Sequence, residues 1–343
     1  MVLVPANRFI AAGKQMIGRP IILLSPIKLW VLALTLLFAL PNCANCVAQV
    51  TAGTGSKQAR QQALKAVPFD QLTPASKTKI GPVLEKPSIY RRLPVTSIDV
   101  DPDMYLFLVR YPEVMVNIWQ IMGVTRMTID RTGPFQLKTD DGVGAASDVE
   151  LIYGTQNKNI YYAEGTYAGP LLKRKLHGRC VMILQTKYER GANGKPKTVN
   201  SLDVFVKVEN ATAGLIAKTL NPIVGPTADH NFVETLKFVQ RLNETTEQNG
   251  TGVQRMAYRL TNLEQQVRDQ FVKIAGTVYE RGSRYRANQA NQANRANQAQ
   301  AAKKQAATAQ HNPNAIPAIP PAASGRSTIQ TSQREERQRI SKQ

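Results

Sequence analysis

The chain has 343 residues, with 44 Lys and Arg against 24 Asp and Glu, a formal net charge of +20, 43% hydrophobic residues and three cysteines. So few cysteines exclude a disulfide-stabilised scaffold, and this apolar content excludes a wholly disordered chain. The presence of a single long apolar run also excludes a polytopic membrane protein.

The positive charge is concentrated towards the two ends of the chain. Residues 111–250 hold 16 basic and 14 acidic side chains, whereas residues 251–343 hold 15 and 5. A nucleic-acid-binding domain needs its charge on the folded surface that meets the phosphates, so a nucleic-acid partner is not expected. The basic tail is either solvated or in contact with an anionic surface.

The first 48 residues have the pattern of a secretory signal peptide. Four basic residues precede the uncharged apolar run Leu29–Leu40, and Pro41 and a small, polar stretch follow it up to Ala48. The pattern predicts an exported protein that is periplasmic, envelope-associated or secreted. Because the run is shorter than a bilayer-spanning helix, cleavage is favoured over a membrane anchor, which stays the alternative. Cleavage after Ala48 would leave Cys180 as the one cysteine, expected to be a small buried hydrophobe.

Residues 49–87 show no sustained hydrophobic period and are predicted to be a flexible linker. A folded domain is expected over residues 88–248. The alternation over Val95–Val100 predicts a strand, and Asp101-Pro102 then predicts a helix start. Two short helices are expected before Gly123, which is a typical helix stop.

Between Val124 and Val208 the hydrophobic period changes to two, which predicts an antiparallel sheet. Turn dipeptides divide this region into six strands, at about 124–130, 134–139, 147–154, 158–167, 177–189 and 198–208. Short connections make successive strands neighbours. A closing helix is then predicted from about Asp229 to Glu247, and its apolar face must be buried against the sheet.

The predicted fold class is therefore α+β: a curved antiparallel sheet of about six to seven strands, gripped by a long C-terminal helix. This order of elements resembles the START-like (SRPBCC) helix-grip superfamily over roughly Ser88 to Gln248. The segment Ser97–Pro102 leading into Tyr111–Met115 looks like that family's first strand and helix pair.

The resemblance implies a cup between the sheet and the closing helix that holds an apolar ligand. Its candidate ligand-binding residues are Tyr161, Ile183, Phe232, Leu236 and Val239. The same residues would also fill an ordinary closed core, so both interpretations stay open.

Apolar residues from Val253 to Val278 recur at the spacing of a long amphipathic helix, predicted over 251–286. This helix either self-associates as a coiled coil or folds back on the domain. Residues 287–343, with an Ala-Asn-Gln repeat and a basic end, are predicted to be a disordered tail that is helical at most near 299–309.

No catalytic nucleophile, nucleotide-binding or metal-binding motif occurs in the sequence, so no catalytic residue, cofactor or metal is predicted. The sequence therefore favours an exported, non-catalytic protein that binds an apolar molecule or an envelope protein. One alternative is a cyclase-like or hydrolytic enzyme that uses His177, Asp148 or Tyr161 in the same cup. The other is a structural protein that assembles through residues 251–286.

Overall fold

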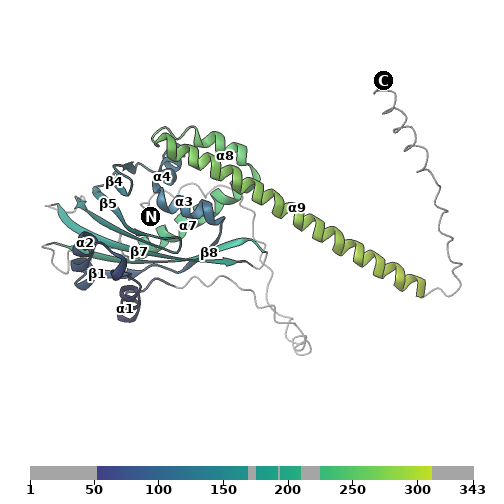
Figure 1. The fold of residues 1–343 in the computed structure, drawn as a ribbon, viewed down its shortest axis with the longest axis horizontal. Coiled ribbons are helices and arrows are strands. Elements are labelled where there is room, and N and C mark those ends of the chain that lie inside the picture. The colour runs from purple at the N-terminus through teal and green to yellow at the C-terminus, as the bar shows by residue number, and fades with distance from the viewer. Residues whose placement is uncertain (1–51, 169–174, 192–193, 210–224, 311–343) are drawn as a thin grey trace, which may run out of the picture. The chain divides into compact units, whose positions relative to one another are not determined.

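The computed structural model describes residues 52–168, 175–191, 194–209 and 225–310 (Figure 1). The proposed signal peptide, the residues after 310 and part of the segment before the closing helix lie outside these ranges. The described residues up to Tyr285 form one compact unit, and a second unit begins at Arg286.

The centre of the first unit is one antiparallel eight-stranded sheet. Six strands follow one another as spatial neighbours in chain order, as the turn signals predicted. Their bounds are β3 (Thr128–Arg131), β4 (Gln136–Asp140), β5 (Ala145–Gly154), β6 (Lys158–Tyr167), β7 (Leu176–Arg190) and β8 (Pro196–Val208). The α+β class with a long C-terminal helix is confirmed.

The edge of the sheet next to β8 consists of two short strands, where the sequence predicted one. Both β1 (Ile89–Arg92) and β2 (Thr96–Asp99) pair with β8, one after the other. Pro94 lies between them and lacks the N–H that a continuous ladder needs, so the edge is interrupted there.

The predicted helix pair and closing helix cover one face of the sheet, called here the inner face. They are α3 (Pro102–Arg110), α4 (Pro112–Ile121) and α7 (Pro226–Gln248). Phe232, Leu236 and Val239 of α7 are buried in one cluster with Leu184 and Leu202 of the strands. Gly123 follows the C-cap of α4 and has a φ of 69°, a left-handed backbone conformation that glycine adopts without strain.

The apolar stripe after residue 251 folds back on this domain. It forms α8 (Gly250–Ala257) and the start of α9 (Gln265–Gln310), so the single helix predicted over 251–286 is interrupted. Val253, Leu260 and Phe271 are at most 4% exposed, in the same cluster as α7. Since the stripe is already buried, the coiled-coil alternative is wrong for these residues.

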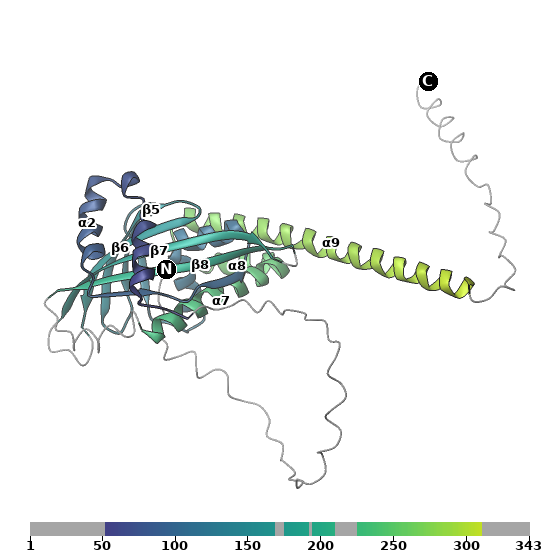
Figure 2. The same cartoon turned by 90° about the horizontal axis from the view of Figure 1, so that it is seen from below.

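The prediction of a flexible linker over 49–87 is wrong for most of that segment. Residues 57–65 form α1 (Lys57–Lys65), residues 69–71 a 3-10 turn η2 (Phe69–Gln71), and residues 74–85 form α2 (Pro74–Glu85). They cover the opposite, outer face of the sheet (Figures 1 and 2). We call residues 52–88 the outer arm.

The outer arm is held by a second apolar cluster and by cations at its helix ends. Ala63, Ile80 and Val83 pack on Ile183 and Phe205 of the strands. Three basic side chains donate to carbonyl oxygens at or near the helix C-termini: Lys158 to Ala66, Arg60 to Leu84 and Glu85, and Lys207 to Pro82. Such cations also oppose the negative end of the helix dipole.

A buried ion pair joins β1, β8 and the outer arm. The carboxylate of Asp203 is fully buried and accepts from Arg92 Nε at 2.8 Å and from the Tyr90 hydroxyl at 2.6 Å. The same guanidinium donates to Gln62 Oε1 and to the Ala59 carbonyl of α1. One arginine therefore neutralises a buried charge and fixes the arm.

The prediction of disorder from residue 287 is also wrong in part, because α9 continues to Gln310. Residues 287–307 are exposed throughout, as expected for a segment with no large apolar side chain. Residues 311–343 lie outside the described ranges. Among the helices that the structure describes, none combines the length and the apolar character needed to cross a bilayer.

We expect the substitution Arg92→Leu to lower the free energy of unfolding by about 3–5 kcal/mol, because it leaves the buried Asp203 carboxylate unpaired. Urea denaturation followed by circular dichroism measures the change. The control is Arg179→Leu on β7, whose partner Glu209 is exposed; a surface pair of this kind contributes about 0–1 kcal/mol. Equal losses in the two variants would contradict a special role for Arg92.

Candidate functional site

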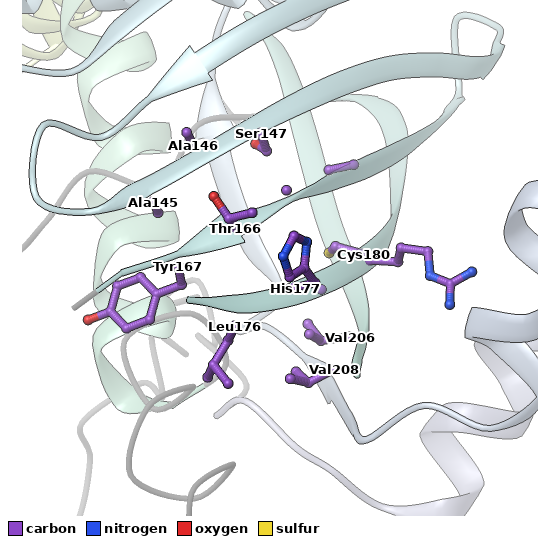
Figure 3. Close-up of a pocket in the computed structure, with 14 residues that line it drawn as sticks. Ala145, Ala146, Ser147, Thr166, Tyr167, Leu176, His177, Cys180, Val206 and Val208 are labelled. Carbon is purple, nitrogen blue, oxygen red and sulfur yellow. The ribbon is translucent and has the colours of Figure 1, made fainter. Parts of the chain in front are cut away.

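An open pocket of about 190 Å³ lies at one end of the sheet, and its lining comes entirely from β5, β6, β7 and β8 (Figure 3). Side chains alternate between the two faces of a strand. Ten of the fourteen lining residues, including Ala163, Cys180 and Val206, fall on the inner-face positions. We call this feature the inner pocket.

The inner pocket is hollow because its floor consists of small residues. Ala145, Ala163, Gly165, Gly178 and Cys180 occupy the inner-face positions of three neighbouring strands. Further along the same face these positions are held by larger side chains, and there the helices pack directly on the sheet. The large residues are Tyr161, Met182, Leu184 and Leu202.

Gly165 allows β5 and β6 to approach each other closely in the floor of the pocket. A Cβ built at this position would lie 2.2 Å from the Ala146 carbonyl oxygen and 2.6 Å from Ser147 Cβ. At Gly178 the nearest atom to such a Cβ would be 3.5 Å away, an ordinary contact. Only one of the two pocket glycines is therefore required by packing.

The walls of the pocket are largely apolar, and His177 and Arg179 border it from the outer-face positions of β7. Leu176, Val206 and Val208 contribute aliphatic side chains, and the Ser147 hydroxyl is engaged with Thr139 Oγ1 at 2.8 Å. Burial raises the pKa of the Cys180 thiol to about 12. A neutral thiol is a poor nucleophile, so Cys180 acts here as a small apolar wall residue.

The predicted ligand-binding residues do not line the inner pocket. Phe232, Leu236 and Val239 are buried in the core beneath α7, where a void of about 20 Å³ has room for about one water. Tyr161 lies on the same face, but its buried hydroxyl donates to the Val109 carbonyl at 2.7 Å. These four residues therefore fill a closed core, the second interpretation that the sequence left open.

The prediction that Ile183 faces the cup is wrong, because its side chain lies on the outer face of the sheet. It lies in the outer cluster with Val83 and Phe205, whereas its neighbours Met182 and Leu184 pack on the inner side. The residues from Cys180 to Leu184 are apolar on both faces of the strand, so no hydrophobic alternation indicates which face Ile183 takes.

The structure does not bring His177, Asp148 and Tyr161 together in one cup. His177 and Asp148 are exposed, and their positions in β7 and β5 alternate with the inner-face residues Cys180 and Val149. Tyr161 is buried on the inner face, and desolvation raises the pKa of its hydroxyl. His177 borders the inner pocket, whereas Asp148 and Tyr161 do not line it, so the three side chains share no site. Within the described residues, no cluster of three or more His, Cys, Asp or Glu could hold a metal ion.

Two buried polar networks fix the helices over the closed part of the inner face. The Tyr105 hydroxyl of α3 lies 3.0 Å from Thr186 Oγ1, which donates to Asn200 of β8. Arg131 of β3 donates to both carboxylate oxygens of Glu113 in α4, at 2.6 and 3.0 Å. These bonds satisfy buried polar groups and explain why the two helices stay close to the sheet.

Comparison with known proteins gave weak structural matches. No family model matches the chain, and no curated protein matches it. An uncharacterised protein from Rhizobium leguminosarum is matched with a TM-score of 0.26 and 15% identity, over 43% of this chain and 95% of its own. Ara h 8.0201 is matched with a TM-score of 0.25 and 14% identity, over 43% and 97%.

The di-domain aromatase/cyclase BexL of the BE-7585A biosynthetic pathway is matched with a TM-score of 0.25 and 15% identity, over 47% of this chain and 49% of its own. Because scores this low carry no argument, the fold class stated here rests on the strand order and on the position of α7.

Sequence reasoning missed the inner pocket because it searched for large apolar residues. A usable signal was present: Ala163 and Gly165 are two residues apart in β6, as Gly178 and Cys180 are in β7. Small residues at alternate positions of two paired strands mark a hollow on one face of a sheet. The register that aligns them is a property of the folded sheet.

We expect Gly165→Ala to lower the free energy of unfolding by about 1–3 kcal/mol, because the added methyl group overlaps β5. Gly178→Ala is the matched control and should be close to neutral, since its Cβ meets only ordinary contacts. Thermal unfolding of both variants, followed by circular dichroism, measures the difference. A tolerated Gly165→Ala would show that the two strands are farther apart than described.

We also expect Cys180 to react slowly with iodoacetamide. A pKa raised to about 12 means that, at neutral pH, the thiolate fraction is roughly a thousandfold below that of an unperturbed thiol. The rate should keep rising with pH up to that value. Mass spectrometry of the peptide that contains Cys180 separates it from Cys43 and Cys46. A plateau near the pKa of a free cysteine would contradict the desolvated environment.

Proposed function

We propose that this is an exported, non-catalytic protein whose inner pocket binds a small apolar ligand. The observation that carries the proposal is a hollow of about 190 Å³ with a floor of Ala, Gly and Cys side chains on an otherwise filled sheet face. The pattern of residues 1–48 supports export, with a membrane anchor as the alternative.

The size of the pocket limits the ligand. Pockets for drug-sized molecules measure about 300–1,000 Å³, and an apolar cavity of about 150 Å³ holds benzene. At about 190 Å³ the inner pocket suits a single ring or the end of an acyl chain. An uncharged group is favoured, because Arg179 already pairs with Glu209 and burial keeps Cys180 neutral.

The non-catalytic half of the proposal is supported by the separation of the candidate catalytic groups. His177 and Asp148 are exposed on the other face from the buried Tyr161. A protein partner in place of a small ligand is the second candidate. A protein partner is favoured less, because a hollow floor of small residues offers no projecting side chain for a protein surface to contact.

We expect Ala163→Leu to abolish binding of an apolar probe, because the larger side chain fills the floor of the pocket. Ala75→Leu on the exposed side of α2 is the control, since it adds the same atoms outside the pocket. Native mass spectrometry after incubation with a lipid extract, and then with fatty acids and single-ring aromatics, measures what is retained. A retained compound should also protect Cys180 from iodoacetamide in the unsubstituted protein.

Two outcomes would contradict the proposal. One is that no compound from the extract or the panel is retained by the unsubstituted chain. The other is that Ala163→Leu and Ala75→Leu retain the same compound equally, which would place the binding site elsewhere.

A further inference from the structure

The outward side of α1 is basic, and its position is set by how the helix packs. Ala59 and Ala63 are the buried residues of α1. Each residue advances about 100° around a helix, so Lys57, Gln61 and Lys65 lie opposite the buried pair. All three are exposed, and within the described residues neither lysine forms an ion pair.

The remainder of the outer arm adds to this charge and carries an exposed aromatic ring four residues after Lys65. Residues 52–88 contain six Lys and Arg against two Asp and Glu. Phe69, in the turn that follows α1, is 41% exposed although it is a large apolar side chain. Lysines together with an exposed aromatic ring are the combination found on surfaces that lie on anionic membranes.

The arm is also the part of the described structure that is closest in sequence to the leader. Only 16 residues, 41–56, separate the apolar run Leu29–Leu40 from Lys57. The chain is fixed to the sheet where it enters the described fold: Thr54 pairs with Arg92, and the Gly53 backbone lies against Asp229. The basic helix therefore follows directly on the segment that would deliver the chain to a membrane.

We propose that the outward side of α1, with Phe69, docks on the surface of a bilayer that contains anionic lipid. Lysine ammonium groups would contact lipid phosphates, and the Phe69 ring would enter the headgroup region. Each lysine near such a surface contributes about a fivefold gain in affinity, and the gain falls as salt screens the charges. The inner pocket takes no part in this contact.

The test measures co-sedimentation of the chain with vesicles of phosphatidylcholine containing one third phosphatidylglycerol. Every described element lies after residue 51, so a chain that begins at Gln49 retains all of them; circular dichroism checks its fold. The double variant Lys57→Gln/Lys65→Gln should bind about 25-fold more weakly, the product of two such contributions. Arg255→Gln/Lys273→Gln, in α8 and α9, removes the same charge from exposed positions outside the arm and should bind like the unsubstituted chain.

A second readout locates the contact. The variant Phe69→Trp should show a blue shift of its fluorescence on anionic vesicles and none on pure phosphatidylcholine. The proposal is overturned if the two double variants weaken binding equally, since the charge of the whole chain would then be responsible. It is also overturned if the fluorescence of the Phe69→Trp variant does not change, or if the lysine pair affects binding to a heparin column but not to vesicles.

Discussion

Phe232, Leu236 and Val239 bury one stripe of α7 against the inner face of the sheet, and the arrangement of the other inner helices depends on this contact. Full burial of such a side chain contributes about 1.5–3 kcal/mol. Trp119 of α4 packs edge-on against Phe238 of α7, and Phe107 of α3 stacks on Phe271 of α9. Arg281 of α9 then pairs with Asp101, the residue that caps α3. Each helix is thus positioned by a neighbour already placed on the sheet.

The same contact explains why the binding site proposed here is not under the closing helix. Leu184 and Leu202 pack in one cluster with α7, and the buried Tyr161 donates to Val109 of α3, so the space between the sheet and these helices is closed. The inner pocket lies where two floor residues, Gly165 and Gly178, have no side chain. One half of the inner face carries large residues and the other half carries small ones. The sheet is therefore closely packed under the helix and hollow at the end of the strands.

On the outer face, charged side chains contribute more to holding the helices than they do on the inner face. Asp203 is buried in the middle of β8 and requires Arg92, and that guanidinium also holds α1 through Gln62 and Ala59. Basic side chains at the ends of α1 and α2 satisfy carbonyl groups that a helix leaves unpaired. The arm that results covers an apolar surface that would otherwise be exposed, and it presents Lys57 and Lys65 outwards.

Several features could be predicted from the sequence, because they depend on local periodicity. The bounds of β6 agree with the predicted 158–167, and the six-strand meander and the closing helix were anticipated from alternation, turn dipeptides and one apolar stripe. Other features depend on which surfaces meet. The arm over residues 57–85 was not predicted to be helical, and its helices pack on the outer face that they cover. The face of Ile183 and the alignment of Ala163 with Cys180 follow from strand register. The sequence by itself determined the six-strand meander, the helix pair and the closing helix, and their order. The tertiary structure decided that residues 57–85 form helices, and which faces are filled and which are hollow, because packing joins residues that are far apart in the chain.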